Sequence, residues 1–306
     1  LGLKKYDGSL RIDDYMESTI TKIIQVIGEF PLHITKPDYD SNRWHTKIFR
    51  VRPLKDIKCE HLRTEYSYPP IIHANTLRAN LKNYPVFYGS DQPGTSIIEY
   101  YQNYSDLNLD EKFCLSIWSI RPNTRIRVSP FIFSSLRKEN PYNGISELML
   151  KELPAKFQAV YSDEESLKKK DILEFYSEAF VRDESHVLSS ILAHRYLYAN
   201  HNLRTDILIY PSVQTDRMAV NFAIQPNFVD ESMVLEKVYV LSAKDIVLKN
   251  GLPDCDLRFF NYGENVDNII YWKGFDLDNP EFRKMVETDF QNRINMDNII
   301  TNKHSH

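Results

Sequence analysis

The sequence predicts a mixed fold of strands and helices, and three observations support this prediction. Val86–Gly89 reads as a short apolar strand, and a helix start follows it directly, with Pro93 near the first helical position. Elsewhere apolar residues recur at helical spacing in some segments and alternate as in strands in others. Tyrosine and phenylalanine number 19 and 16, which suits a mixed fold with aromatic-lined clefts, or else a tyrosine-rich core.

Composition limits the class of protein and the kinds of partner. With 306 residues, 42% of them hydrophobic, the chain suffices for one large domain or two small ones. A net charge of -4 gives no general attraction to nucleic acid or anionic lipid, so we expect no direct nucleic-acid binding and no membrane association. Apolar runs stay well short of a membrane span, and the first residues lack the apolar core of a signal sequence. We therefore expect a cytoplasmic protein.

Cysteine and glycine usage weakens the case for several kinds of site. Cys59, Cys114 and Cys255 lie far apart without C-x-x-C spacing, which argues against a zinc knuckle and fits a reducing compartment. The 9 glycines form neither G-x-G-x-x-G nor G-x-x-x-x-G-K-[ST]. The sequence therefore gives little support to a Rossmann or P-loop nucleotide site.

The first part of the chain is expected to support the rest. Apolar residues at helical spacing predict a helix from Met16 to Ile27, which Gly28 ends. A polar, turn-rich linker follows over Lys36–Trp44. We therefore interpret residues 1–44 as an N-terminal helical support.

The next element is the strand KIFRVRP. Its alternation places Arg50 and Arg52 on one face together with Ile48. A face with two arginines usually points to solvent, unless it lines a ligand cleft. Both arginines are thus candidates for binding an anionic ligand.

Glu99 is the candidate functional carboxylate. It lies about two turns into the helix that begins near Ser90, and its neighbours Ile97 and Ile98 are apolar. A carboxylate in such surroundings becomes partly buried and needs a partner, which Arg78 could supply. The alternative is an ion pair between Arg78 and Glu99 with a purely structural role, which is the commoner case for an isolated pair.

Two helical segments follow further along the chain. Residues 134–184 are charge-rich and predict a solvated helical insertion. An amphipathic helix over His186–Asn200 comes next, with His194 and His201 near its end. These two histidines would share a helical face, but a third ligand is missing, so we expect no metal site.

A second informative stretch carries polar residues beside buried strands. Ile207–Tyr210 predicts a buried strand, and Pro211 ends it, so that Ser212 lies on a loop where its hydroxyl can face a ligand. In the strand Val220–Ile224 the polar Asn221 needs a hydrogen-bond partner. After the sheet strand MVLEKVYVL, residues 251–306 form a polar C-terminal extension.

Four stretches of this sequence are similar to the motifs of one family. Arg78-Ala79-Asn80 matches G-R-x-N without its glycine, and VFYGSDQPGTSIIE matches V-L-Y-x-(A/S)-x-x-x-x-x-A-x-x-E. TDILIYPSVQ and NFAIQP match D-G-I-x-Y-P-S and N-x-A-x-x-P. In motif order and residues the chain resembles the RES-domain family, which is named for an arginine, a glutamate and a serine. The matching positions here are Arg78, Glu99 and Ser212.

The resemblance also suggests how the chain is organised. It covers roughly residues 47–241 and includes Arg50 in a preceding F-R strand, so residues 45–250 are expected to form the catalytic domain, interrupted by the 134–184 insertion. Thr76 and Leu77 stand where the family usually has glycine before the arginine, and Leu208 stands where glycine follows Asp-x. These departures alter the shape of turns, whereas the greater length leaves partner and regulation open.

The resemblance implies a fold and an activity. The fold would be α+β and similar to ADP-ribosyltransferases, with a mixed central sheet, flanking helices and a helical insertion. Family members are bacterial toxins that split NAD at the nicotinamide bond, often with inorganic phosphate as co-substrate, and an Xre-type antitoxin holds them inactive. NAD would be substrate rather than cofactor, no other cofactor or metal is implied, and a homodimer is kept open.

The chemistry of NAD cleavage fits the candidate residues. Nicotinamide leaves as a neutral ring, so the main demand is to stabilise an oxocarbenium-like ribose, and Glu99 can supply the negative charge. The pyrophosphate requires guanidinium groups, for which Arg78 and Arg50 are the first choices and Arg52 is a weaker third.

Three further residues are assigned to binding. Tyr88, at the end of its strand, could stack on the nicotinamide ring. Ser212 and Asn221 would form hydrogen bonds with the ribose or with an amide. Each also has a purely structural interpretation, as a core tyrosine, a turn serine and a sheet-edge asparagine.

Two alternatives to NAD degradation remain. The chain could transfer ADP-ribose to a protein or nucleic acid, as some family members are described to do. It could instead be a catalytically silent interaction module that uses the insertion as its binding surface. Release of nicotinamide from NAD distinguishes the enzymes from the silent module.

Overall fold

A computed structural model gives the arrangement of most of the chain after residue 46. It describes residues 47–103, 111–133, 136–147, 162–199, 204–249, 252–291 and 300–301, and separately positions 9, 11, 14–15, 17–19, 21–22 and 151. Much of the helix expected over Met16–Ile27, the linker at Lys36–Trp44, and His201 lie outside the described residues.

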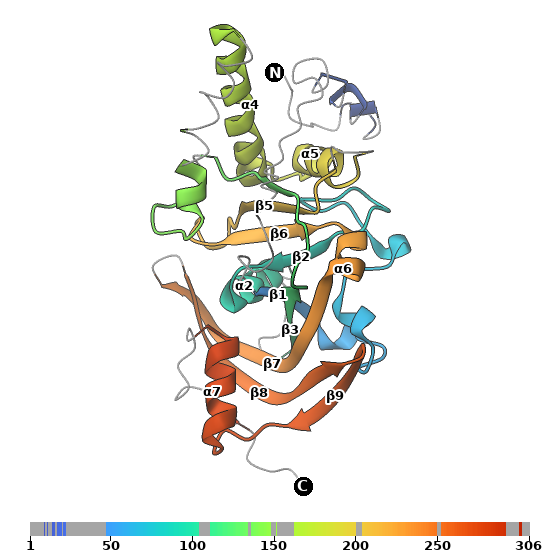
Figure 1. The fold of residues 1–306 in the computed structure, drawn as a ribbon, viewed down its shortest axis with the longest axis vertical. Helices are drawn as coiled ribbons and strands as arrows, with labels where there is room; N and C mark the ends of the chain where they lie inside the picture. Colours follow the sequence, from blue (N-terminus) through green and yellow to red (C-terminus); the bar gives the residue numbers. More distant parts are fainter. Residues whose placement is uncertain are drawn as a thin grey trace.

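A ten-stranded mixed sheet runs through the described part of the chain (Figure 1). The strands are β1 (Ile48–Pro53), β2 (Phe87–Ser90), β3 (Phe113–Ile120), β4 (Val128–Pro130), β5 (Ile207–Pro211), β6 (Val220–Ile224), β7 (Met233–Lys249), β8 (Leu252–Val266), β9 (Ile269–Gly274) and β10 (Ile300–Thr301). Their order is β10-β8-β7-β3-β1-β2-β6-β5-β4, with β9 also paired to β8. The pairs β4–β5 and β8–β10 are parallel and the others antiparallel.

Helices flank the sheet. They are α2 (Pro93–Asn103), α4 (Asp163–Arg182), α5 (Val187–Leu197), α6 (Pro226–Ser232) and α7 (Pro280–Asp289), and the short 3-10 turns η1 (Leu54–Asp56), η2 (Arg63–Tyr66) and η3 (Ile71–His73) follow β1. In Figure 1, α4 and α5 lie beyond β5 at one end of the molecule, and α7 lies at the other end beside β7 and β8. The structure therefore confirms a large mixed sheet with flanking helices.

The strands and helix that carry the candidate residues form where the sequence predicts them. The first strand is β1, and α2 begins at Pro93, so Glu99 lies about two turns into that helix. Strand β5 ends at Pro211 and β6 covers Val220–Ile224. These local predictions succeed because apolar alternation and proline act within a few residues.

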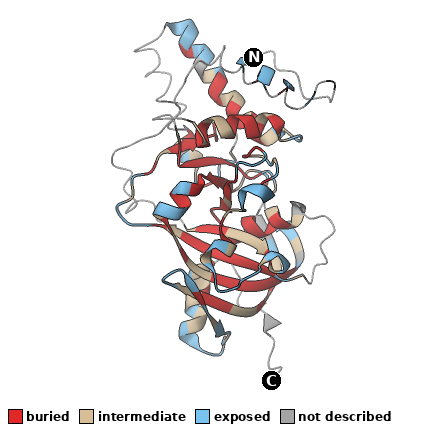
Figure 2. Ribbon diagram, turned by 90° about the vertical axis from the view of Figure 1, so that its right-hand side faces the viewer, coloured by how far each residue is buried: buried red, intermediate tan, exposed pale blue. Residues whose placement is uncertain are grey.

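Apolar side chains on the two faces of the sheet form three buried clusters. The α4–α5 cluster takes side chains of β5 and β6, such as Leu208 and Ala223, and packs them against the two helices. A second cluster, on the opposite face, includes Ile48 and Phe87. The α2–α7 cluster includes Phe49 and packs β3, β7 and β8 against α2 and α7. Figure 2 shows that burial is concentrated in the strands and on the inner sides of α4 and α5.

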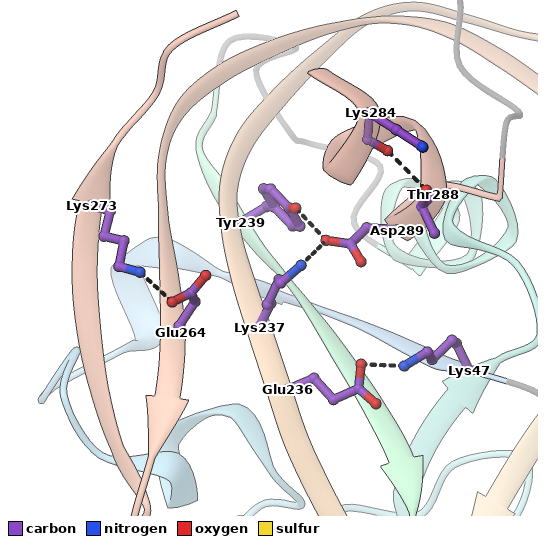
Figure 3. Close-up of polar contacts among 9 residues, drawn as sticks. All are labelled: Lys47, Glu236, Lys237, Tyr239, Glu264, Lys273, Lys284, Thr288 and Asp289. Carbon is purple, nitrogen blue, oxygen red and sulfur yellow. Dashed lines mark hydrogen bonds and ion pairs between the residues drawn. The ribbon is translucent and has the colours of Figure 1, made fainter. Parts of the chain in front are cut away.

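The C-terminal segment differs from the expected extension, because it continues the same sheet. Strand β8 pairs with β7 from Lys237↔Glu264 to Lys249↔Leu252. Helix α7 is joined to β7 through Asp289, whose Oδ2 lies 2.6 Å from Lys237 Nζ and 2.6 Å from the Tyr239 hydroxyl (Figure 3). A long antiparallel pair satisfies backbone groups that a separate extension would leave to solvent.

The insertion also differs in part from the sequence prediction. The first turns of α4 are solvated, and Ser162 and Glu165 form a capping box at the start of the helix. Its second half, however, buries Ile172, Leu173 and Phe180 in the α4–α5 cluster. The insertion is therefore built into the core beside β5.

Candidate active site

Glu99 lies at the centre of a group of polar residues from three strands and one helix. Its Oε1 accepts a hydrogen bond from the Ser212 hydroxyl at 2.7 Å and another from the Asn221 side-chain amide at 2.7 Å. Glu99 is half-buried on α2, whereas Ser212 and Asn221 are buried, at 0% and 6% exposure. Two neutral donors therefore fix the orientation of this carboxylate.

The strand register explains why these groups meet. Asn221 on β6 lies directly opposite Ser90 on β2 and Tyr210 on β5, so the three side chains form a row on one face of the sheet. The Ser90 hydroxyl donates to Asn221 Oδ1 at 2.6 Å, which leaves the amide nitrogen directed at Glu99. Ser212 follows Tyr210 by two residues and returns to the same face.

The surroundings of Glu99 oppose its ionisation. Burial raises the pKa of this carboxyl, while the hydrogen bonds from Ser212 and Asn221 and the positive charge of Arg78 act in the opposite direction. Burial is the largest of these effects, so the pKa lies above its usual value. A carboxyl group whose pKa is perturbed by burial and by nearby donors is typical of functional sites.

Arg78 is presented by a small turn that β2 holds in place. The turn is closed by hydrogen bonds between the backbones of Leu77 and Asn80, at 3.0 and 3.3 Å. The Tyr88 hydroxyl donates to Asn80 Oδ1 at 2.8 Å and accepts from the Ala79 backbone N–H at 2.9 Å. The Tyr88 hydroxyl thus links the turn to β2 by two hydrogen bonds. The stacking role of its ring stays a prediction.

The Arg78 guanidinium reaches the site without pairing directly to Glu99. It donates a hydrogen bond to the backbone carbonyl of Phe180 at the end of α4. Burial raises the pKa of Glu99 and that of Tyr210, and the charge of Arg78 acts against both shifts. Among the described residues, no hydrogen bond or ion pair joins Arg78 to Glu99, so a simple structural ion pair does not account for the arrangement.

Arg50 and Arg52 lie on the other face of the sheet. Phe49 opposes Ser90, so its neighbour Arg50 points away from the Glu99 face. The Arg50 guanidinium lies 5.2 Å from the centre of the Phe87 ring and donates to the Tyr88 carbonyl at 2.8 Å. Arg52 lies beside Glu65, with 3.6 Å between Arg52 and the Glu65 carboxylate. Their predicted roles in dinucleotide binding stay predictions.

The structure thus brings together Arg78, Tyr88, Glu99, Ser212 and Asn221. Comparison with known proteins adds little to this geometry. No family model and no curated protein matches the sequence. Among solved structures, the chain is similar to one in the M. tuberculosis MbcT-MbcA toxin-antitoxin complex, at 11% identity over 64% of this chain and 84% of that chain. The TM-score of 0.35 is too low for this likeness to bear on function.

A cluster of potential metal ligands and a membrane-spanning helix are both absent from the described residues. They contain no group of three or more His, Cys, Asp or Glu side chains that could hold a metal ion. His194 instead packs against aromatic rings, with its ring centre 4.4 Å from that of Tyr84 and 5.2 Å from that of Tyr198. None of the described helices is long and apolar enough to cross a membrane.

Three residues near the site were not predicted from the sequence. Tyr210 could have been found, because it precedes Ser212 by two residues on an alternating strand. Phe180 and His186 come from the insertion and the loop after it, and they reach Arg78 only through the tertiary fold. Local sequence pattern carries no signal for such a contact.

Proposed function

We propose that this chain is an enzyme that cleaves the nicotinamide–ribose bond of NAD, by phosphorolysis or hydrolysis, and acts as a bacterial toxin or defence effector. One observation carries the proposal. Ser212 and Asn221, which follow Glu99 by 113 and 122 residues in the chain, both donate hydrogen bonds to its carboxylate, and Arg78 acts on the same group electrostatically. Residues singled out by motif similarity thus meet around one acidic group.

The geometry suits a cationic transition state. Cleavage releases neutral nicotinamide and leaves positive charge on the ribose, which an ionised Glu99 would stabilise from a site of low polarity. Ser212 and Asn221 hold the carboxylate in one orientation, so that little reorganisation is needed during the reaction. We assign Glu99 the central catalytic role and Ser212 and Asn221 the role of orienting it.

Arg78 is the first choice for the diphosphate. A guanidinium has five N–H donors in a planar fork, and it binds phosphate oxygens in pairs. One of these donors goes to the Phe180 carbonyl, which leaves the others for substrate. Arg50 and Arg52 would contribute from the far side of β1, so a role for them in binding NAD is the weaker part of the proposal.

The test is to incubate the purified chain with NAD, with and without inorganic phosphate, and to measure nicotinamide. Release that depends on phosphate supports phosphorolysis, and release without phosphate supports hydrolysis. The Glu99→Gln variant keeps the shape of the side chain and is expected to lose most activity. A folded wild-type chain that leaves NAD intact under both conditions contradicts the proposal.

The same experiment can address the acceptor and the partner. The assay is repeated with NAD that carries a label in its ADP-ribose part. Label that becomes attached to a protein or nucleic acid identifies the chain as an ADP-ribosyltransferase. We also propose an Xre-type antitoxin as partner, which follows from the sequence resemblance. Coexpression with such a protein is expected to suppress nicotinamide release.

A further inference from the structure

The end of α4 is the part of the insertion closest to the site. Phe180 lies in the last turn of this helix, and its side chain is fully buried in the α4–α5 cluster. The ring centre of Phe180 lies 5.1 Å from that of Tyr210. Tyr210 in turn lies opposite Asn221, which binds Glu99.

The backbone of the same residue contacts Arg78. The last carbonyls of a helix lack partners within the helix and attract cationic side chains. In α4 the Ala179 carbonyl accepts from the Asp183 backbone N–H at 3.1 Å, and the Phe180 carbonyl accepts from the Arg78 guanidinium. Phe180 therefore contacts Arg78 through its carbonyl and Tyr210 through its ring.

The corner between α4 and α5 is held by Asp183. Its carboxylate accepts from the Ser189 backbone N–H at 2.9 Å and from the Ser185 hydroxyl at 2.7 Å, so it caps the start of α5. His186, with a φ of 60°, lies in this corner with its Nδ1 3.0 Å from the Asp183 carbonyl. Burial and the nearby charge of Arg78 lower the pKa of His186. These hydrogen bonds fix the conformation of the corner beside Arg78.

We propose that Phe180 is a positioning residue, through which the insertion orients the Arg78 guanidinium and steadies Tyr210 beside Glu99. The helix end holds one of the five guanidinium donors and leaves the others for an anionic substrate. The insertion is then part of the substrate-binding machinery and not a separate binding surface. The kinetic consequence rests on the proposed cleavage of NAD, whereas the geometry does not.

The kinetic test compares two substitutions on one helix. Phe180→Ala loosens the end of α4, and Phe175→Ala removes a ring that packs against the same cluster from a partly exposed position. We expect Phe180→Ala to raise KM for NAD at least tenfold with a smaller change in kcat, and Phe175→Ala to raise it less than threefold. Phe180→Leu, which refills much of the space, is expected to restore most of the affinity. Equal KM changes in the two alanine variants overturn the proposal.

A second readout does not depend on activity toward NAD. The imidazole of His186 reports the position of Arg78, and its titration can be followed by NMR in the full chain. We expect Phe180→Leu to raise the pKa of His186 slightly, Phe180→Ala to raise it toward the value in Arg78→Gln, and Phe175→Ala to leave it unchanged. An unchanged titration in a folded Phe180→Ala variant overturns the positioning role. A wild-type chain that fails to cleave NAD defeats the proposed function while leaving this readout intact.

Discussion

Ionisation of Glu99 lowers the stability of the fold, but it supplies the negative charge that the proposed reaction needs. The residue is half-buried, and burial raises the pKa of its carboxyl. A carboxyl whose pKa is higher in the folded than in the unfolded state destabilises the fold once it ionises. Its stabilising contribution is complete below the unfolded pKa and is lost as the pH rises through the folded pKa.

Stability and activity should therefore change in opposite directions with pH. From about pH 4.3, the usual pKa of Glu, up to the raised pKa of Glu99, we expect unfolding free energy to fall and nicotinamide release to rise. Glu99→Gln is expected to remove this component from the stability profile. Denaturant unfolding at several pH values measures this component. If the unfolding free energies of wild type and variant differ by the same amount at every pH, the pKa of Glu99 is not raised.

Ser212 should affect both the fold and the pH profile. Ser212→Ala removes a buried donor to Glu99, so we expect a stability loss of about 1–2 kcal/mol and a shift of the pH–rate profile to higher pH, since this hydrogen bond lowers the pKa of Glu99. Ser146→Ala is the matched control, because Ser146 is also buried and donates to the Ile132 carbonyl at 2.8 Å. A control variant that shifts the profile equally would show a general effect of stability.

The sequence predicts that the Glu99 carboxylate needs a polar partner, but it does not predict which residue that partner is. Apolar neighbours indicate burial, and burial of a carboxylate demands donors. Arg78 was the expected partner, whereas the hydrogen bonds come from Ser212 and Asn221. Which of several polar side chains lies within 3 Å depends on strand register, which a single sequence does not specify.

Among the elements, β2 is constrained by the close approach of β1. A Cβ added to Gly89 would lie 2.5 Å from Ile48 Cγ2 and 3.1 Å from the Phe49 carbonyl oxygen. Gly89→Ala should therefore push the two strands apart and cost about 1–3 kcal/mol in unfolding free energy. Because β2 carries Tyr88 and Ser90, we expect activity to fall as well.

Gly144→Ala provides the control for this substitution. A Cβ at Gly144 would meet nothing within 4 Å, so its stability should change by less than about 1 kcal/mol. Denaturant midpoints of the two variants give the comparison. Equal stability of both variants would show that β1 and β2 tolerate a wider spacing.

The insertion shows what helical pattern alone could reveal. Charged residues such as Glu164 and Lys168, which lie 2.7 Å apart, make the first half of α4 polar, and this charge-rich composition predicts a solvated segment. Ile172, Tyr176 and Phe180 recur every four residues in the second half and form a buried stripe. Such a stripe is typical of a packed helix, although the charge-rich composition led us to interpret the whole segment as solvated. Its contact with Arg78 depends on where β5 lies.

On the scale of the whole molecule, one sheet joins the parts that the sequence analysis separated. Strand order β2-β6-β5-β4 brings segments together that are distant along the chain. Short-range pattern predicts the strands themselves but not this order, because pairing depends on long connections. The boundary expected near residue 250 accordingly falls between the paired strands β7 and β8.

Removing the C-terminal segment should therefore unfold the protein. A chain that ends at residue 250 loses the following members of the α2–α7 cluster: Leu257, Phe259, Tyr262, Val286 and Phe290. Each large core side chain contributes about 3–5 kcal/mol, and a domain has about 5–15 kcal/mol in total. We expect no cooperative unfolding transition in the truncated chain, whereas a chain that ends at Thr301 should keep it. Cooperative unfolding of the shorter chain would show that 251–306 is a separate extension.

The most direct test of the account is a crystal structure of the Glu99→Gln variant with intact NAD. We predict that the bond between nicotinamide and ribose lies in contact with residue 99, with the diphosphate against Arg78. Binding of the dinucleotide elsewhere, such as the groove between β7 and α7 lined by Lys237 and Lys284, would contradict it. So would a crystal soaked at saturating NAD that holds none beside residue 99.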